Sequence, residues 1–287
     1  MQQYTIAGLV VEVSGYGLNH IPGFDIFLSY NKESNAGVKI YLGKQIVDRT
    51  LHPLYCFKLE DILCEFAKVD TGYYFHIISA DKNDLLMEMK LLEESVFITT
   101  NMDVHSPSHL LRFAVWLAFG IYSVSRHTVA VHSSAVIYKD KAILFLGESG
   151  TGKSTHARLW LEHIPNTELL NDDSPFVYAD EKKAIAFGSP WSGKSPCFKN
   201  KHTPIAGIVR LSKAPCNKIV KLSKISAIGA LLPSCPPAFA YDEYLSDRIC
   251  EILSFLIQQV PVYSLECVPD ESAAKLVFST LKNEGYL

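Results

Sequence analysis

The residues from Gly147 to Ser154 have the types and spacing of a phosphate-binding loop. Gly147 is followed, after four residues, by Gly152-Lys153-Ser154, which fits the pattern G-x-x-x-x-G-K-[ST]. Glycines in such a loop let backbone N–H groups turn toward phosphate oxygens. The pattern predicts that Lys153 faces the β- and γ-phosphates of a nucleotide and that Ser154 binds Mg²⁺. The predicted nucleotide-binding residues are Gly147, Glu148, Ser149, Gly150, Thr151, Gly152, Lys153, Ser154 and Thr155.

Two adjacent carboxylates, Asp172 and Asp173, follow this loop closely. Asp172 lies 19 positions after Lys153, which is a short distance compared with motors and GTPases. Phosphoryl transfer to a hydroxyl needs a proton acceptor as well as a metal-side ligand, and two neighbouring carboxylates could divide these tasks. The alternative is a capping or Asx turn before Pro175. The nearby loop favours the catalytic interpretation, and the residues alone leave open which aspartate has which task.

Other polar residues are candidates with a structural alternative. His132 lies in a strand-like stretch, where a lone histidine is either a core residue or a neighbour of the phosphates. Lys194 could stabilise charge on the transferred phosphoryl group, or it could be a solvated lysine in a surface turn. Arg210 is either an anion contact or simply exposed. His156 and Arg158 are expected on a solvated or interdomain face of the helix after the loop.

The segments "HSSAVIYKDKAILFLGESGTGKSTHARLWL" and "LLNDDSPFV" resemble the nucleotide-binding core of the HPr kinase/phosphorylase-related family. That core is akin to the core of ATP-dependent phosphoenolpyruvate carboxykinases. The resemblance spans residues 126–212 and includes "GSPWSGK" (188–194). It implies a serine/hydroxyl kinase that uses ATP and Mg²⁺ and forms homo-oligomers. It also implies that Asp172 is the acid/base, that Asp173 is a metal-side carboxylate and that His132 neighbours the phosphates.

The rest of the chain departs from this family. Residues 1–105 do not match the N-terminal domain of HPr kinase, and no glycine- and basic-rich segment follows residue 215. No counterpart of the oxaloacetate-binding arginines of carboxykinases is found either. The acceptor is therefore open between a protein, a peptide and a small molecule. Two alternatives to a kinase also stay open, namely an ATP-binding regulatory or sensor module without turnover and a carboxykinase-like enzyme.

The elements that must position these residues follow from the apolar patterns. The apolar run 141–146 predicts a buried strand before the loop, and 153–163 predicts a helix after it, which argues against a chance glycine-rich turn. Short β-branched and aromatic runs, including "FDIFLSY", predict a β-rich N-terminal domain over 1–105. Residues 106–287 are expected to form a P-loop domain with a mixed sheet and flanking helices, in which 106–125 is a joining helix. The fold class is α/β (α+β).

Composition sets the surroundings in which this chemistry would take place. The 287 residues have a net charge of −3, so a nucleic-acid partner is not expected. The seven cysteines include no C-x-x-C pair and suggest a reducing compartment. The N-terminus lacks the basic start of a signal peptide, and the most apolar segment is shorter than the roughly 20 residues that a bilayer requires. The expectation is a cytoplasmic protein without a membrane partner.

Overall fold

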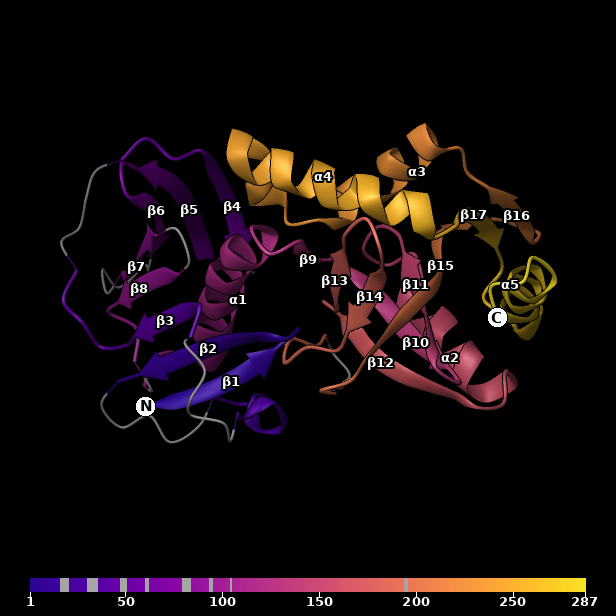
Figure 1. Ribbon diagram of the computed structural model, residues 1–287, viewed down its shortest axis with the longest axis horizontal. Helices are drawn as coiled ribbons and strands as arrows, with labels where there is room; N and C mark the ends of the chain where they lie inside the picture. The colour runs from indigo at the N-terminus through magenta and orange to yellow at the C-terminus, as the bar shows by residue number, and fades with distance from the viewer. Residues whose placement is uncertain are drawn as a thin grey trace. The chain divides into compact units, whose positions relative to one another are not determined.

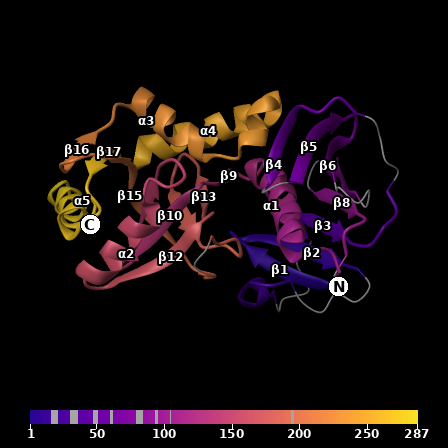
Figure 2. The same ribbon diagram turned by 180° about the vertical axis from the view of Figure 1, so that it is seen from behind.

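Two mixed β-sheets with their own helices make up the protein, as the computed structural model shows (Figures 1 and 2). The structure describes residues 1–15, 21–29, 36–46, 51–59, 62–78, 84–92, 95–103, 105–193 and 196–287. This architecture confirms the predicted α+β class. The chain divides into unit 1, Met1–Arg126 with Ala238–Ser246, and unit 2, His127–Pro237 with Asp247–Leu287.

Unit 1 contains an eight-stranded sheet. Its strands are β1 (Gln2–Ile6), β2 (Leu9–Ser14), β3 (Val38–Tyr41), β4 (Tyr55–Leu59), β5 (Ile62–Val69), β6 (Gly72–Ile78), β7 (Leu85–Leu91) and β8 (Val96–Thr100). They lie in the order β1-β2-β3-β8-β7-β6-β5-β4. Only the pairs that β3 makes with β2 and β8 are parallel, so among the described strands the sheet is mostly antiparallel.

The predicted strand "FDIFLSY" is wrong over most of its described part. The chain instead forms a short 3-10 helix, η1 (Asp25–Phe27), and only Leu28 makes an isolated bridge, to Tyr4. Phe24 and Phe27 are both fully buried. Residues three apart point to opposite faces of a strand but to one side of a helical turn, so burying both rings favours the turn.

Helix α1 (Ser108–Val124) packs in unit 1. The apolar positions that recur along it are buried, as the helical spacing predicts. The predicted division into domains 1–105 and 106–287, which places this helix in the second domain, stays a prediction.

The chain returns to unit 1 after residue 237. Phe239 of η3 (Pro237–Tyr241) lies against Gly120 of α1, and its ring centroid is 6.4 Å from that of Phe66. Asp242, just before α4 (Glu243–Gln259), accepts hydrogen bonds from Lys68 Nζ at 2.6 Å and from Tyr73 Oη at 2.8 Å. A buried carboxylate with these partners fixes the returning segment onto unit 1.

Unit 2 contains the second sheet. Its strands are β9 (Thr128–Ala130), β10 (Ser133–Tyr138), β11 (Lys141–Leu146), β12 (Thr167–Asp173), β13 (Phe176–Ala179), β14 (Ala184–Phe187), β15 (His202–Lys213), β16 (Lys218–Lys221) and β17 (Val262–Cys267). Their order is β12-β10-β11-β15-β14-β13-β9, and β17 pairs with β15 and with β16. β15 runs parallel to β11 and β17, and the other pairs are antiparallel.

Helices cover this sheet and set the position of the loop. They are α2 (Lys153–His163), α3 (Lys224–Leu231), η2 (Leu232–Ser234), the later part of α4, and α5 (Glu271–Asn283). One core cluster joins α2 and α5 to the sheet through residues such as Trp160, Leu281 and Phe145. Figure 2 shows α2 beside β10 and β12. In the described part of the chain, no helix is both long and apolar enough to cross a membrane.

Candidate active site at the end of β11 and β12

The predicted loop connects strand β11 to helix α2. Gly147, Gly150 and Gly152 have φ angles of +149°, +78° and +105°, a region that other residues rarely adopt. A Cβ atom at Gly147 would also lie 2.5 Å from Thr151 Oγ1. The backbone of the loop therefore requires the glycines that define the sequence pattern. Gly152 begins α2 without a side-chain cap, which leaves the N–H groups of the first turn to bind an anion.

Lys153 is held inside the loop. Its ammonium group donates hydrogen bonds to Gly147 O at 2.9 Å and Glu148 O at 3.1 Å. Burial lowers the pKa of Lys153, and the nearby charges of Asp173 and Asp172 oppose this by raising it. The positive charge therefore lies among the loop carbonyls, close enough to both carboxylates to interact with them.

The carboxylate pair is placed by strand pairing. In the antiparallel pair of β10 and β12, Ser134 faces Asp172 and Ser133 faces Asp173. Ser134 Oγ donates a hydrogen bond to Asp172 Oδ1. Asp172 is buried, whereas Asp173 is half exposed and contacts His132, whose Nδ1 is 3.3 Å from Asp173 Oδ1. The two neighbouring aspartates thus occupy different environments.

Asn171 connects the aspartate pair to the segment 188–193. It is fully buried, and its Nδ2 donates to Trp191 O at 2.9 Å and to Ser189 Oγ at 3.2 Å. Its Oδ1 accepts from Ser174 N at 2.9 Å. Gly193 N in turn donates to Asp172 O at 2.8 Å. The segment is therefore fixed against the end of β12, next to the carboxylates.

A pocket of about 740 Å³ unites these groups, and its size suits a small ligand. It is lined by His132, Ser134, Ser149, Gly150, Gly152, Lys153, Ser154, Thr155, Ala157, Arg158, Leu161, Leu169, Asp172, Asp173 and Gly193. A second pocket, of about 300 Å³, shares Ser149 and Gly150. Its other lining residues are Glu148, Thr151, Arg210, Leu211, Ser212 and Lys213.

The structure places the predicted residues as follows. His132, Asp172 and Asp173 lie in the larger pocket with most of the loop, and Glu148 and Thr151 lie in the smaller one. Gly147 lines neither pocket, but its carbonyl oxygen accepts a hydrogen bond from Lys153 Nζ. Lys194 lies outside the described residues.

Two residues near the site, His156 and Arg210, differ from the expectation. His156 is buried rather than solvated, and its ring packs on Phe145 with a centroid distance of 4.6 Å. Arg210 is not simply exposed, because its Nη1 donates to Ala230 O at 3.0 Å.

Ser134, Asn171 and Ser189 were missed from the sequence. These serines and this asparagine belong to no recognisable sequence motif. Their contacts depend on residues far along the chain. The nearest available signal is that Asn171 directly precedes the aspartate pair.

The residues present fit a magnesium ion, which needs few protein ligands, better than a metal that is bound only by protein side chains. Among the described residues, no group of three His, Cys, Asp or Glu side chains could hold a metal. Ser154 and Asp173 nevertheless line the same pocket, and both offer oxygen ligands. Mg²⁺ commonly takes one or two protein oxygens and completes its shell with phosphate and water. These two residues match that requirement.

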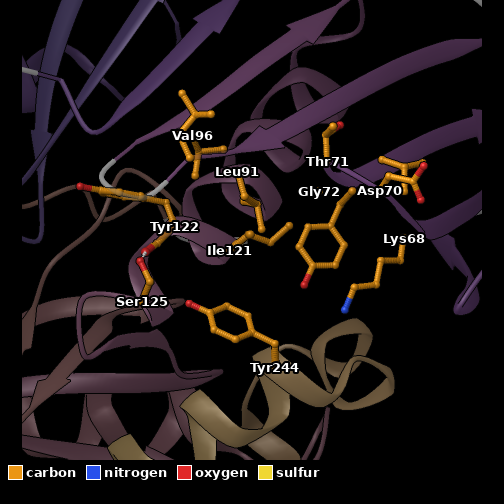
Figure 3. Close-up of a pocket in the computed structure, with 13 residues that line it drawn as sticks. Lys68, Asp70, Thr71, Gly72, Leu91, Val96, Ile121, Tyr122, Ser125 and Tyr244 are labelled. Atoms are coloured by element: carbon orange, nitrogen blue, oxygen red, sulfur yellow. Dashed lines mark hydrogen bonds between the residues drawn. The ribbon is translucent and has the colours of Figure 1, made fainter.

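Unit 1 has a pocket of its own, of about 430 Å³ (Figure 3). Leu91 and Ile121 lie at its centre, between Val96 and Tyr244. Three of its polar side chains bond to protein partners: Lys68 and Tyr73 bond to Asp242, and Ser125 Oγ donates to Tyr122 O. The loop and the carboxylate pair lie in unit 2.

Comparisons with known proteins add little to this geometry. No family model matches the chain, and no curated protein matches it. Among solved structures, the chain is similar to the Hpr(Ser) kinase/phosphatase from Coxiella burnetii, with 12% sequence identity and a TM-score of 0.32. The alignment covers 54% of this chain and 89% of the other. Likeness at this TM-score assigns no function to the chain.

Proposed function

We propose that the chain is an ATP-dependent phosphotransferase of the HPr-kinase-like type, which moves the γ-phosphate to a hydroxyl group. The observation that carries the proposal is one pocket that contains Lys153, Ser154, Asp172 and Asp173 together. A phosphate loop binds the donor, and an adjacent carboxylate can accept the proton of the attacking hydroxyl. Nucleotide binding alone does not require such a base.

The donor half of the site is formed by the loop and the start of α2. The loop N–H groups and the positive end of α2 would bind the phosphates, and Lys153 would face the β- and γ-phosphates. Ser154 and Asp173 are the residues that would hold Mg²⁺, which supplies charge neutralisation on the phosphates when bound. His132 supports this half through its contact with Asp173, where its Nδ1 is 3.3 Å from Oδ1.

The acceptor half depends on Asp172. Ser134 bonds to Oδ1, so Oδ2 is the oxygen assigned to the hydroxyl proton. Asp172 therefore acts as the base and Asp173 as the metal-side carboxylate in this proposal. Lys194 directly follows Gly193, which lines the pocket, and stays a candidate for stabilising charge on the transferred group.

The test combines binding and turnover. Mg-ATP should raise the melting temperature of the wild type, because a ligand that binds only the native state stabilises it. Lys153→Ala should abolish this shift. Asp172→Asn should keep the shift but lower transfer of label from γ-³²P-ATP to an acceptor panel by about 10²–10⁴-fold, the usual contribution of a general base.

Two results would change the proposal. A wild-type protein that binds Mg-ATP but labels no acceptor would be an ATP-binding sensor module. Decarboxylation of oxaloacetate coupled to ATP would instead favour a carboxykinase-like enzyme. Unchanged turnover in Asp172→Asn would remove Asp172 from the chemistry.

A further inference from the structure

The stretch from residue 182 to residue 241 differs in charge from the rest of the chain. It contains ten Lys and Arg residues and no Asp or Glu, although the whole chain has 30 acidic residues and 27 basic ones. The net charge of −3 therefore conceals a basic segment within an otherwise acidic chain. Such an asymmetry points to an anionic partner for the surface that the segment forms.

The basic segment brings strand β16 and helix α3 to one face of the second sheet. Arg210 of β15 and Val220 of β16 both pair with Ser264 of β17, so these three side chains share a face. Arg210 Nη1 donates to Ala230 O, which places α3 on this face. Ile219 packs instead against the core cluster on the other face. Both views show α3 and β16 on the outside of unit 2 (Figures 1 and 2).

Helix α3 is apolar on both faces, and one of them is open to solvent. The inner face buries Ala227, Ala230 and Leu231. On the outer face, Ile225 is 88% exposed. A Cβ atom at Gly229, four residues further on, would meet nothing within 4 Å. A surface helix of a globular protein normally has polar residues on its outer face, so an apolar outer face suits a partner that removes it from water.

Lysines flank this apolar face. Lys218 lies on the same side of β16 as Val220, because side chains two residues apart in a strand share a face. Lys224 lies in the first turn of α3, where the helix dipole disfavours a cation, so helix stability does not explain it. Within the described chain neither lysine forms an ion pair, and this includes Lys218 with its strand neighbour Glu266. The α3 patch consists of these two lysines and the exposed apolar residues Val220, Ile225 and Leu232.

We propose that the α3 patch binds the surface of a membrane that contains anionic phospholipids. The apolar side chains would enter the boundary between headgroups and acyl chains, and the lysines around them would contact lipid phosphates. A side chain as exposed as Ile225 needs a matching hole in a folded partner, whereas a fluid lipid layer accepts it without one. Nucleic acid supplies phosphates but no apolar layer for this residue.

This proposal departs from the expectation of no membrane partner. That expectation rested on the net charge and on the length of the apolar segments, and neither quantity reports a local patch. Binding to a membrane surface does not require a spanning helix, because only one face of the protein enters the interface.

Cosedimentation of the full chain with lipid vesicles tests the proposal. At about 0.1 M salt, wild type should bind vesicles with about 30% phosphatidylserine roughly tenfold more tightly than pure phosphatidylcholine vesicles, and salt of about 0.5 M should remove this preference. Ile225→Asp should weaken binding roughly tenfold, because it replaces the inserted apolar side chain by a charge. Ile225→Trp should strengthen binding, since tryptophan favours the interface. Lys218→Gln combined with Lys224→Gln should lose the preference for phosphatidylserine.

Matched variants make the same changes elsewhere. Leu92→Asp places a carboxylate at another exposed apolar side chain, which is 57% exposed and belongs to unit 1. Lys199→Gln combined with Lys201→Gln removes two charges from the same basic stretch, but these lysines are already paired with Glu168. Both controls should bind vesicles as wild type does. Circular dichroism and melting temperature should show that the variants of the α3 patch are folded.

Several outcomes would overturn the proposal. They are a wild type that binds neither kind of vesicle, Ile225→Asp binding as tightly as wild type, and an equal loss in Leu92→Asp. A wild-type oligomer that ignores vesicles and that Ile225→Asp dissociates, as measured by light scattering, would assign the patch to a second copy of this chain. None of these measurements uses ATP, so the result is independent of the proposed phosphotransferase.

Discussion

At the scale of single residues, Asp172 depends on Ser134 for its orientation. Ser134 and Ser133 are adjacent buried serines of β10, but only Ser134 reaches the carboxylate. The Ser133 hydroxyl donates to Val131 O at 3.1 Å instead. This difference follows from the strand, whose successive side chains point to opposite faces.

Removing the Ser134 hydroxyl should reduce turnover without affecting nucleotide binding. We expect Ser134→Ala to lower kcat by roughly tenfold, because one hydrogen bond of about 1.4 kcal/mol no longer orients the base. KM for ATP should stay unchanged. Steady-state kinetics with a labelled acceptor measures both quantities.

The neighbouring serine provides the control. Ser133→Ala should retain wild-type kcat, and Ser134→Thr, which keeps the hydroxyl, should recover most of the loss. Equal losses in Ser133→Ala and Ser134→Ala would mean that the strand, and not the contact with Asp172, is responsible.

At the scale of elements, α2 has two faces with different tasks. Arg158 and Leu161 line the pocket on one face, and His156 and Trp160 are buried on another. Burial lowers the pKa of His156 to about 4 from 6.5, since the charged imidazolium is poorly solvated there. The Nε2 atom of His156 is buried without a hydrogen-bond partner among the described residues. The packing of helix α2 therefore favours the neutral form of His156.

This histidine should make stability depend on pH. The unfolded chain takes up a proton below pH 6.5 and the folded chain only below about 4, so this contribution to stability is complete above about 6.5 and lost as pH falls toward 4. The shift corresponds to about 3 kcal/mol. His156→Phe should flatten the fall in unfolding free energy between pH 7 and pH 4.5, as measured by urea denaturation.

A second histidine of α2 serves as the comparison. His163, at the partly exposed end of the helix, gives the variant His163→Gln, which removes a histidine from α2 without opening the buried site of His156. A His156→Phe protein that loses stability with pH as steeply as wild type would contradict this account.

At the scale of the whole molecule, a segment far along the chain completes unit 1. Asp242 is the contact that fixes it, with a side chain that is 2% exposed, whereas its partner Lys68 is 53% exposed. Leu245 N also donates to Asp242 Oδ1 at 3.0 Å. The two partners of this ion pair should therefore contribute very differently to stability.

Asp242→Ala should lower the free energy of unfolding by about 1.5–3 kcal/mol, because Tyr73 loses a charged acceptor in a buried place. Lys68→Ala should lower it by less than about 1 kcal/mol, since an exposed ammonium keeps its hydration. Chemical denaturation of the two variants measures the difference. Equal losses would show that the ion pair, and not the buried hydrogen bonds, holds the segment.

The sequence by itself determined the loop between β11 and α2. The glycines, Lys153 and Ser154 form a local pattern, and the strand and helix around them follow from short-range periodicity, so no distant contact was needed. Local rules failed at "FDIFLSY", because the burial of Phe24 and Phe27 overrode the strand preference of these residues.

Only the tertiary structure decided how the carboxylates are supported. The contact of Ser134 with Asp172 requires that β10 and β12 pair in one register, across an irregularity between Ala135 and Val136. The bonds from Asn171 to residues 189 and 191 likewise join parts of the chain that a sequence pattern does not relate. Register is set by which face of each strand is buried, and a shift of one residue would turn Asp172 away from Ser134. That physical dependence on the whole sheet is why the loop was predictable and its partners were not.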